Sequence, residues 1–503
     1  MKIETRRMAR KLLDALREVW SYNLGKIGLV LFVAIVVISI AAVVSMPPDF
    51  PSKWEDPKSW ELNPRLAPPD WVTILGYQLS PTEKIVFTKP TRIVKKGDYE
   101  YIVYEAKYNL DVNDYPQDVI VAFVEPRTDL KAYANTSTEF ILNITRPDGK
   151  EITVAEQSLT IPQLSNVRIR FSTSIAIQSA TEVLKLENIS IPLEKANQVV
   201  FGIVKVFSNG SYALQPLKGT YTIKLCVKVY NSELLEKYAS VSERAKLLLE
   251  DVRKLEQGVA NQVIIYVKGN RYGLMGTDID GRDLALGVFY GFPVALLVGF
   301  FAAVTATFIG AIAGVVSGYY GGLIDDLIQR IVDVLSNIPL LPILVLVGVI
   351  VQQIFTNPWH RLLTIIAFLI LFSWGGVAIM VRSMTLSIKA EPYVEAAKAA
   401  GAGDLRIIFR HVFPQIVPYL FAVLVFNVPG AILTEAGLSV LGIRHGLPTW
   451  GDILSRANEH REIAFGCWWW IIPPGVMLAL TSFTFVSLGM ALETMVEPRL
   501  RGR

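Results

Sequence analysis

The sequence predicts an α-helical membrane protein with six transmembrane helices and a mainly-β domain inserted after the first of them. The chain has 503 residues, of which 52% are hydrophobic, and these gather in long windows that contain no charged side chain. Between the first two windows lies a long polar segment in which apolar and polar residues alternate as they do in β-strands. Membrane helices and an outer β domain follow from these two patterns.

Six windows contain no Asp, Glu, Lys or Arg, and each holds the roughly 20 residues that a helix needs to cross a hydrocarbon core. They are Ile27–Met46, Leu284–Ile324, Val334–His360, Leu362–Val381, His411–Thr434 and Ile463–Leu492. The first window is longer than the apolar region of a signal peptide, and Val43-Val44-Ser45 is a poor cleavage site. We therefore expect residues 27–46 to remain as the first transmembrane helix.

Lys and Arg near the ends of these windows predict the orientation in the membrane. With the N-terminus inside, sixteen of them fall on the cytoplasmic side, beginning with Lys2, Arg6 and Arg7. Outside the large polar segment, only Arg361, Arg444, Arg456 and Arg461 fall on the outer side. Both termini are thus expected in the cytoplasm, with 1–26 as a cytoplasmic segment and 47–283 as an extracellular region. The net charge of +4 then reflects the excess of Lys and Arg on the cytoplasmic side, and no nucleic-acid partner is expected.

The outer region carries strand and turn signals that predict a β-sandwich. Thr220–Tyr230 alternates strictly between apolar and polar residues, and Asp148-Gly149 and Asn209-Gly210 are typical hairpin turns. The other predicted strands are Tyr99–Lys107, Asp118–Val124, Phe140–Thr145, Glu151–Val154, Val167–Ser172, Val200–Phe207, Ser211–Leu214 and Gln262–Val267. A single interrupting helix is predicted, with a capping box of Ser240 and Glu243 and an end at Gly258.

All four N-x-Ser/Thr sequons of the chain lie in this outer region. They are the glycosylation candidates Asn135, Asn143, Asn188 and Asn209. Their placement agrees with an extracellular location. Clustering by chance remains the alternative, because strand-rich domains are also rich in Ser and Thr.

The sequence offers no sign of catalysis or of a metal site. Cys226 and Cys467 form no disulfide framework, and the four histidines show no paired zinc spacing. A G-x-x-x-x-G-K-[ST] phosphate-binding loop is missing, so the chain is not expected to hydrolyse ATP itself. A membrane-anchored enzyme or a receptor is a weaker hypothesis. Asp325, Asp326 and Asp333 form the nearest acidic group, at the edge of the third window.

Residues 389–414 form a loop between the fourth and fifth windows, and we expect two short helices in it. Pro392 lies just inside the first helix, and Gly401 stands where a left-handed C-cap residue belongs. Asp404 is predicted as the N-cap of the second helix, which enters the membrane at Val412. A small helix that projects in this way suits docking into a groove on a soluble partner.

This loop resembles the EAA loop of binding-protein-dependent ABC importer permeases. The matching residues are Glu395, Ala396, Ala397, Gly401, Ile407, Ile408 and Pro414. Asn63–Trp71 and Tyr272–Tyr290 look like two halves of one extracellular stretch in peptide-type permeases. Residues 72–271 are therefore expected to be an insertion into that stretch.

Further segments are similar to the second permease subunit of dipeptide, oligopeptide and nickel ABC importers, in the order found in that family. They are Gly318–Pro339, Ile432–Gly442, Pro448–Leu454, Trp468–Pro473 and Glu497–Arg501. The resemblance implies a type I ABC importer fold, in which 284–503 is a permease core with five transmembrane helices and the EAA loop. Its ATPase-coupling residues would be Glu395, Ala396, Ala397, Gly401, Asp404 and Pro414.

The same resemblance implies the partners: a homologous second permease subunit, two ABC ATPase subunits that hold ATP and Mg, and an extracellular solute-binding protein. Peptides or similar small solutes are the expected substrates, and oligosaccharides and nickel remain alternatives. The residues that line the substrate path remain open. Glu435 is the only acidic residue between His411 and Leu447, and we expect it to make a structural hydrogen bond.

Overall fold

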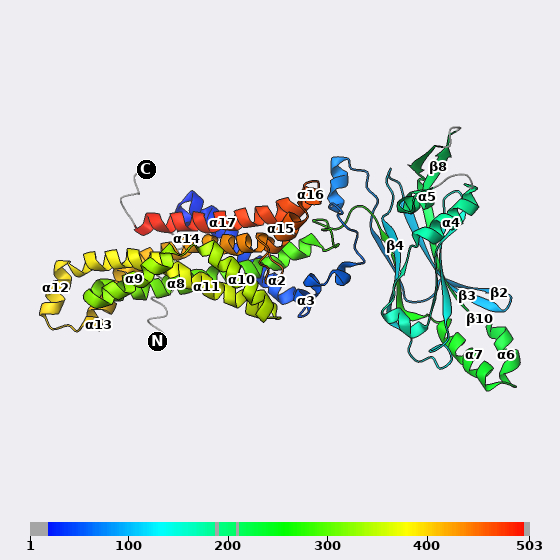
Figure 1. Ribbon diagram of the computed structural model, residues 1–503, viewed down its shortest axis with the longest axis horizontal. Coiled ribbons are helices and arrows are strands. Elements are labelled where there is room, and N and C mark those ends of the chain that lie inside the picture. The colour runs from blue at the N-terminus through cyan, green and yellow to red at the C-terminus, as the bar shows by residue number, and fades with distance from the viewer. Residues whose placement is uncertain (1–18, 187–190, 208–210, 497–503) are drawn as a thin grey trace. The chain divides into compact units, whose positions relative to one another are not determined.

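The computed structural model describes residues 19–186, 191–207 and 211–496 (Figure 1). The chain folds into two compact units. The membrane unit comprises Met1–Pro57 and Leu284–Arg503. The second unit comprises Lys58–Asp283 and is named the outer unit after the location that the sequence predicts for it. Asn188, Asn209, the Asn209-Gly210 turn and Glu497–Arg501 lie outside the described residues, as does most of the 1–26 segment.

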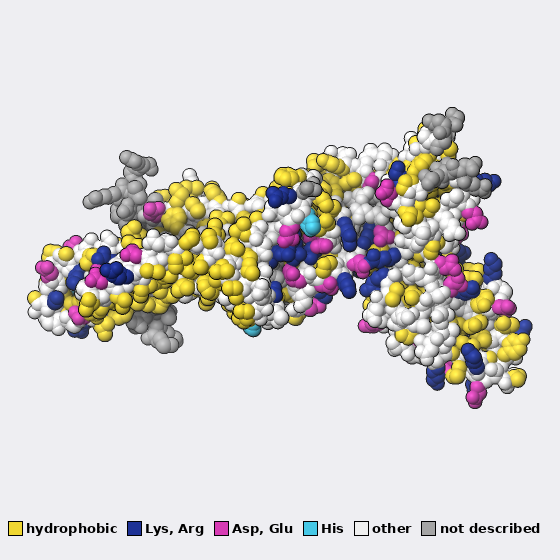
Figure 2. Space-filling view, in the orientation of Figure 1, with side chains coloured by type: hydrophobic (Ala, Val, Ile, Leu, Met, Phe, Trp, Pro, Cys, Tyr) yellow, Lys and Arg dark blue, Asp and Glu magenta, His cyan; other side chains and the backbone are white. Residues whose placement is uncertain are grey.

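Five helices of the described membrane unit are long and apolar enough to cross a membrane. They are α2 (Asn23–Ser45), α8 (Leu284–Tyr320), α11 (Pro358–Lys389), α14 (Phe413–Val440) and α17 (Trp468–Val496). These helices lie side by side in a bundle (Figure 1). Hydrophobic side chains cover the flanks of this bundle, whereas charged side chains gather toward its ends (Figure 2). This distribution is the one expected of a protein that spans a bilayer.

The third predicted window is not one straight helix. The structure has α9 (Gly322–Asn337) and α10 (Leu340–Ile354), which meet at an angle of 78°. Pro339 causes the break, since a proline disfavours helical dihedrals in the preceding residue, and Ile338 indeed has φ −82° and ψ 122°. The two helices are long and apolar enough to cross a membrane only when they are counted together as one broken span.

Two other predicted boundaries are corrected. The fifth span does not start at His411, because helical structure runs from Asp404 to Val440. The sixth starts at Trp468 rather than at Ile463, which belongs to the short helix α16. The remaining short helices of this unit are α3 (Phe50–Glu55), α12 (Pro392–Ala399), α13 (Asp404–Ile407), α15 (Trp450–Glu459) and α16 (Arg461–Ala464).

Glycines allow α8 and α11 to pack closely. Added Cβ atoms at Gly310 and Gly314 would each lie 2.6 Å from a carbonyl oxygen of α11, belonging to Trp374 and Ala378. Such distances are too short for any real Cβ, so only glycine permits this backbone approach. Small residues serve membrane helix packing in the same way in general.

The outer unit is a sandwich of two sheets, which confirms the predicted β-rich domain. One sheet has the order β1-β11-β4-β7 and the other β2-β3-β10-β5-β6, with antiparallel pairing between all described neighbours. The strands are β1 (Glu83–Phe87), β2 (Arg92–Lys96), β3 (Tyr99–Leu110), β4 (Asp118–Pro126), β5 (Thr138–Thr145), β6 (Glu151–Leu159), β7 (Ile169–Arg170), β8 (Gly202–Val206), β9 (Tyr212–Pro216), β10 (Gly219–Tyr230) and β11 (Ala260–Lys268). Strands β8 and β9 form a separate hairpin.

Side chains from both sheets meet in the core of the sandwich. Phe123 of β4 lies edge-on to Phe140 of β5, with ring centroids 5.8 Å apart, and Phe87 of β1 meets Tyr104 of β3 in the same way. The alternation predicted for β10 is confirmed, because every second residue from Tyr221 to Val229 is at most 1% exposed.

The helices of the outer unit differ from the prediction. The structure has four α-helices in the described residues: α4 (Thr173–Leu184), α5 (Ala196–Val200), α6 (Ser232–Ala239) and α7 (Glu243–Leu255). The N-cap of α7 is Ser242 rather than Ser240, since the Ser242 hydroxyl accepts from the Ala245 N–H. Val241, which the predicted cap would place inside the helix, consequently lies before it and is 87% exposed.

The two family-like halves that flank the insertion pair with each other. The Tyr272 N–H donates to Pro68 O at 2.8 Å, the Asp70 N–H to Gly273 O at 2.9 Å, and the Thr277 N–H to Ala67 O at 2.8 Å. This ladder closes at the ends of the predicted insertion. The two halves therefore form one continuous stem, although about 200 residues separate them in the sequence.

Candidate functional site: the loop between α11 and α14

Helix α12 is a short helix that ends in a Schellman motif. The Gly401 N–H donates to Lys398 O at 3.0 Å, and the Ala402 N–H donates to Ala397 O at 3.1 Å. Gly401 has φ +83°, which confirms the predicted left-handed C-terminal residue. Pro392 occupies the first turn, where its missing N–H costs nothing. These residues fix both ends of the helix.

One side chain anchors α12 to the membrane unit. Val394 is 3% exposed and belongs to a cluster with Val315 and Tyr319 of α8 and with Ile407 and Ile408. Of the predicted coupling residues on this helix, Glu395 and Ala396 are exposed and Ala397 is half-buried. Most of the surface of α12 is therefore exposed and available to a partner.

The C-terminal end of α8 holds the second helix of the loop. The Tyr319 hydroxyl donates to the Asp404 carboxylate at 2.8 Å. The Lys389 ammonium donates to Tyr319 O at 2.6 Å, so that Tyr319 contacts both the start of the loop and the start of α13. Asp404 is not the predicted N-cap, because Gly403 occupies that position and Asp404 is the first helical residue.

Between these residues lies a pocket of about 460 Å³. Its lining residues are Tyr319, Lys389, Val394, Glu395, Lys398, Ala399 and Ile407. Glu395 of the predicted motif thus lines the same pocket as Val394 and Tyr319, which hold α12 in place.

A π-helical turn joins α13 to α14. It covers Ile408–Val412 and directly precedes Phe413 and Pro414. Proline has no N–H to donate to the carbonyl four residues back, and its ring crowds that carbonyl. A wider turn before Pro414 accommodates the ring without ending the helix. Pro414, the last of the predicted coupling residues, is exposed at this junction.

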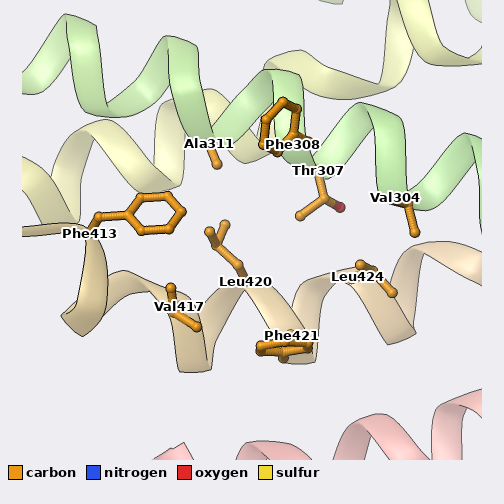
Figure 3. Close-up of a pocket in the computed structure, with 9 residues that line it drawn as sticks. All are labelled: Val304, Thr307, Phe308, Ala311, Phe413, Val417, Leu420, Phe421 and Leu424. Atoms are coloured by element: carbon orange, nitrogen blue, oxygen red, sulfur yellow. The ribbon is translucent and has the colours of Figure 1, made fainter. Parts of the chain in front are cut away.

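An apolar groove lies between α8 and α14 (Figure 3). It has a volume of about 300 Å³, and its lining residues are Val304, Thr307, Phe308 and Ala311 of α8 with Phe413, Val417, Leu420, Phe421 and Leu424 of α14. Thr307 is the only polar residue among the nine, and its buried hydroxyl has no hydrogen-bond partner among the described residues. Sequence reasoning missed this groove, because apolar residues in a span look alike whichever surface they face.

Glu435 confirms the structural role predicted for it. Its Oε1 atom accepts hydrogen bonds from Ser439 at 3.0 Å, from Thr449 at 3.2 Å and from His445 Nε2 at 3.1 Å. The Leu447 N–H donates to His445 Nδ1, so the imidazole carries its proton on Nε2 and donates it to Glu435. These bonds hold the chain between α14 and α15.

The two described sequons differ in accessibility. Asn135 is exposed in the loop before β5. Asn143 lies half-buried within β5 at a bulge, and its amide donates to Glu151 at 3.1 Å. Groups of His, Cys, Asp and Glu suited to a metal ion do not occur in the described part of the chain.

Comparison with known proteins assigns the family. Residues 306–502 match the family described as binding-protein-dependent transport system inner membrane component. The chain is 36% identical over 229 residues to the dipeptide transport system permease protein DppC of Bacillus subtilis, an alignment that covers 45% of this chain and 68% of that protein. The chain is a peptide-type ABC importer permease subunit.

Other relatives agree with this assignment. The permease is 35% identical over 232 residues to the oligopeptide transport system permease protein OppC of Haemophilus influenzae, which covers 46% of this chain and 71% of that protein. Among solved structures, the inward-facing MetNI methionine ABC transporter aligns with 42% of this chain and 97% of the compared chain. Its TM-score of 0.33 and identity of 17% are too low to add to the assignment.

Proposed function

We propose that this permease forms half of the translocation path of an ATP-driven importer of peptides or similar small solutes. The observation that carries the proposal is α12, an exposed helix that Val394 anchors at the end of a membrane bundle. ATP and Mg would be held by two ATPase subunits that dock on this helix. A homologous permease subunit would supply the other half of the path, and a solute-binding protein would deliver the substrate.

Coupling would proceed through the contacts around Tyr319. A movement of α12 is transmitted to α11 through Lys389 and to α14 through Asp404, because Tyr319 contacts both residues. ATP-driven closure of the partner ATPases would thus displace α11 and α14 together and open the path to alternate sides. Glu395, Ala396 and Ala397 would form the docking surface, whereas Gly401 and Pro414 shape the backbone around it.

The topology belongs to the same proposal. Counting α9 and α10 as one broken span gives six spans. With both termini in the cytoplasm, α12 lies on the side where ATP is available, and residues 47–283 lie outside the cell. The inserted domain would then receive or retain the binding protein near the outer mouth of the path.

Cysteine crosslinking tests the docking of the ATPases. In a background with Cys226 and Cys467 replaced by Ser, Ala396→Cys should crosslink to an ATPase subunit through a short bismaleimide. Leu441→Cys serves as the control, because Leu441 is 59% exposed beyond the opposite end of α14. Crosslinking of both variants, or of neither, would contradict the proposed surface. Uptake of labelled dipeptide, nickel or oligosaccharide into vesicles that contain the complete transporter distinguishes the substrate classes.

A further inference from the structure

The outer unit carries a pocket on the solvent-facing side of its five-stranded sheet. Tyr99 of β3 and Tyr230 of β10 are direct partners across the two strands. Their rings stack with centroids 5.7 Å apart and an interplanar angle of 26°. The residues are 38% and 40% exposed, so this aromatic pair is available to a ligand.

Polar side chains from three strands complete the pocket. Its lining includes Glu139 of β5, Ser158 of β6 and Lys228 of β10, in a volume of about 230 Å³. Lys228 forms an ion pair with Glu139 at 2.7 Å, and its ammonium lies 4.6 Å from the centroid of the Tyr99 ring. Thr136 and Ser137 of the loop before β5 line the same pocket.

Strand register holds these groups in place. Lys228 is paired with Glu139 on one side, and Glu139 is paired with Ser158 on the other. The Tyr230 N–H donates to the hydroxyl of Tyr133, a residue that is only 2% exposed. The pocket is therefore built on the sheet itself, which positions side chains more rigidly than a loop does.

The charges of the pocket favour a neutral ligand that is rich in hydroxyl groups. A charged ligand would have to compete with the ion pair of Lys228 and Glu139, and Glu156, which hydrogen-bonds to Glu139, further disfavours an anion. Two neighbouring hydroxyls of a sugar fit the pair without breaking it, since one donates to the carboxylate while the other accepts from the ammonium. The C–H face of a pyranose ring also packs well against the electron-rich face of a tyrosine.

We propose that this pocket binds a pyranose unit of an oligosaccharide. Tyr99 and Tyr230 supply the stacking surface, and Glu139 and Lys228 hydrogen-bond to vicinal hydroxyls. The lining residues of the pocket all belong to the outer unit, whereas the proposed path is formed by the membrane helices, so the inference does not depend on which solute the permease imports. It gives the inserted domain a capacity to bind glycans on the outer side of the membrane.

The sugar has two conceivable sources, which an experiment separates. Asn135 precedes Thr136 and Ser137, so a glycan on this sequon would be attached at the rim of the pocket. The alternative source is an oligosaccharide that is not attached to this chain. Protein expressed in a host that does not glycosylate carries no glycan on Asn135. Any sugar binding measured with this protein therefore comes from the added oligosaccharide alone.

The test uses the full chain in lipid nanodiscs, titrated by calorimetry with cellohexaose, maltohexaose and chitohexaose. At least one hexasaccharide should bind with a Kd below the millimolar range. Tyr99→Ala combined with Tyr230→Ala should weaken this binding at least 10-fold, whereas the corresponding Phe variants should retain it. Tyr238→Ala on α6 is the matched control, because Tyr238 is 58% exposed outside the pocket.

Two results would overturn the proposal. One is the lack of binding by all three hexasaccharides up to millimolar concentration in the non-glycosylated protein. The other is binding that persists unchanged in the double Ala variant. If sugar binds to non-glycosylated protein and to Asn135→Gln from a glycosylating host, but not to glycosylated wild type, the attached glycan occupies the same pocket. None of these outcomes bears on the proposed transport function, which is tested separately by crosslinking and by solute uptake.

Discussion

The hydroxyl of Tyr319, at the C-terminal end of α8, donates a hydrogen bond to the carboxylate of Asp404 at 2.8 Å. These residues stand 85 positions apart, and their contact ties the first long helix of the permease core to the start of the helix that continues into α14. Lys389 reaches the backbone of the same tyrosine from α11. Through its side chain and its backbone carbonyl, Tyr319 thus joins the three elements that surround α12.

Tyr319→Phe should weaken the coupling of ATP hydrolysis to transport without unfolding the permease. The variant keeps the ring and loses one hydrogen bond to a charged group, an interaction that contributes roughly 1.5–3 kcal/mol. We expect several-fold less uptake per ATP hydrolysed in vesicles that contain the complete transporter. Tyr320→Phe is the control, since its neighbouring ring is 44% exposed. Equal coupling ratios in the two variants would exclude a role for the Tyr319 hydroxyl.

Gly314→Val should destabilise the membrane unit. The new side chain would meet Ala378 O and the Val381 side chain, and overpacking of this kind costs about 1–3 kcal/mol. Gly430→Val in α14 is the matched control, because an added Cβ there has no neighbour within 4 Å. Thermal unfolding in detergent should show a lower midpoint for Gly314→Val than for the control. A midpoint equal to that of the control would contradict the close packing of α8 and α11.

The outer unit should unfold with a distinctive pH dependence. Burial raises the pKa of Asp118 to about 6, and burial lowers the pKa of the paired Lys268 to about 8. An acid with a raised folded pKa loses stability as pH rises from its unfolded value near 4 to 6. A lysine with a lowered folded pKa gains stability as pH rises from 8 toward 10.5. Stability should therefore be lowest between pH 6 and 8.

Urea denaturation of residues 58–283, expressed alone and followed by circular dichroism, measures this dependence. The fragment should fold as a strand-dominated unit with cooperative unfolding. Asp118→Asn should reduce the fall in stability between pH 4 and 6 by about 3 kcal/mol, whereas the raised pKa values of Glu83 and Asp278 leave the remainder of the fall in place. A helix-dominated or unfolded fragment would refute the prediction that this domain folds independently. An unchanged fall in stability between pH 4 and 6 in Asp118→Asn would refute the role of Asp118.

Deleting Val72–Arg271 should show whether the insertion retains the binding protein or acts as a protective cap or spacer. The Tyr272 N–H bonds to Pro68 O at 2.8 Å, so Trp71 and Tyr272 can be joined while the stem is kept. If the domain retains the binding protein, its loss should raise the apparent KM for transport by roughly 100-fold, because a tether raises effective concentration. An unchanged KM and an unchanged affinity for the binding protein would instead support a protective cap or spacer.

Local patterns were sufficient to predict much of this structure. The alternation in Thr220–Tyr230 predicts β10, and Gly401 after an Ala-rich helix predicts the left-handed C-terminus of α12. Both features depend on residues that are close in sequence. The resemblance predicted that the two stem halves belong to one stretch, but it did not predict their hydrogen-bonded pairing, because nothing in either half identifies its partner about 200 residues away.

Other features had no local signal or had a misleading one. No helix was predicted for Thr173–Leu184, whose β-branched residues lower its helix propensity, yet it forms α4 and packs against β6. Ser240 and Ser242 are both acceptable caps, and only tertiary packing selects Ser242. The contact between Tyr319 and Asp404 depends on how α8 and α13 meet, which neither segment encodes alone.

Helix α12 is proposed to transmit the action of the ATPases, and Gly401→Val probes this role at a single backbone position. Gly401 has φ +83° and no neighbour within 4 Å of an added Cβ, so the substitution acts through backbone strain rather than through a clash. Gly403→Val is the matched control, because Gly403 has φ −70° and the same open space. The measurement is stimulation of ATPase activity by the substrate-loaded binding protein in the reconstituted complex. We expect stimulation to be lost in Gly401→Val and retained in Gly403→Val, whereas wild-type stimulation in Gly401→Val would contradict the account.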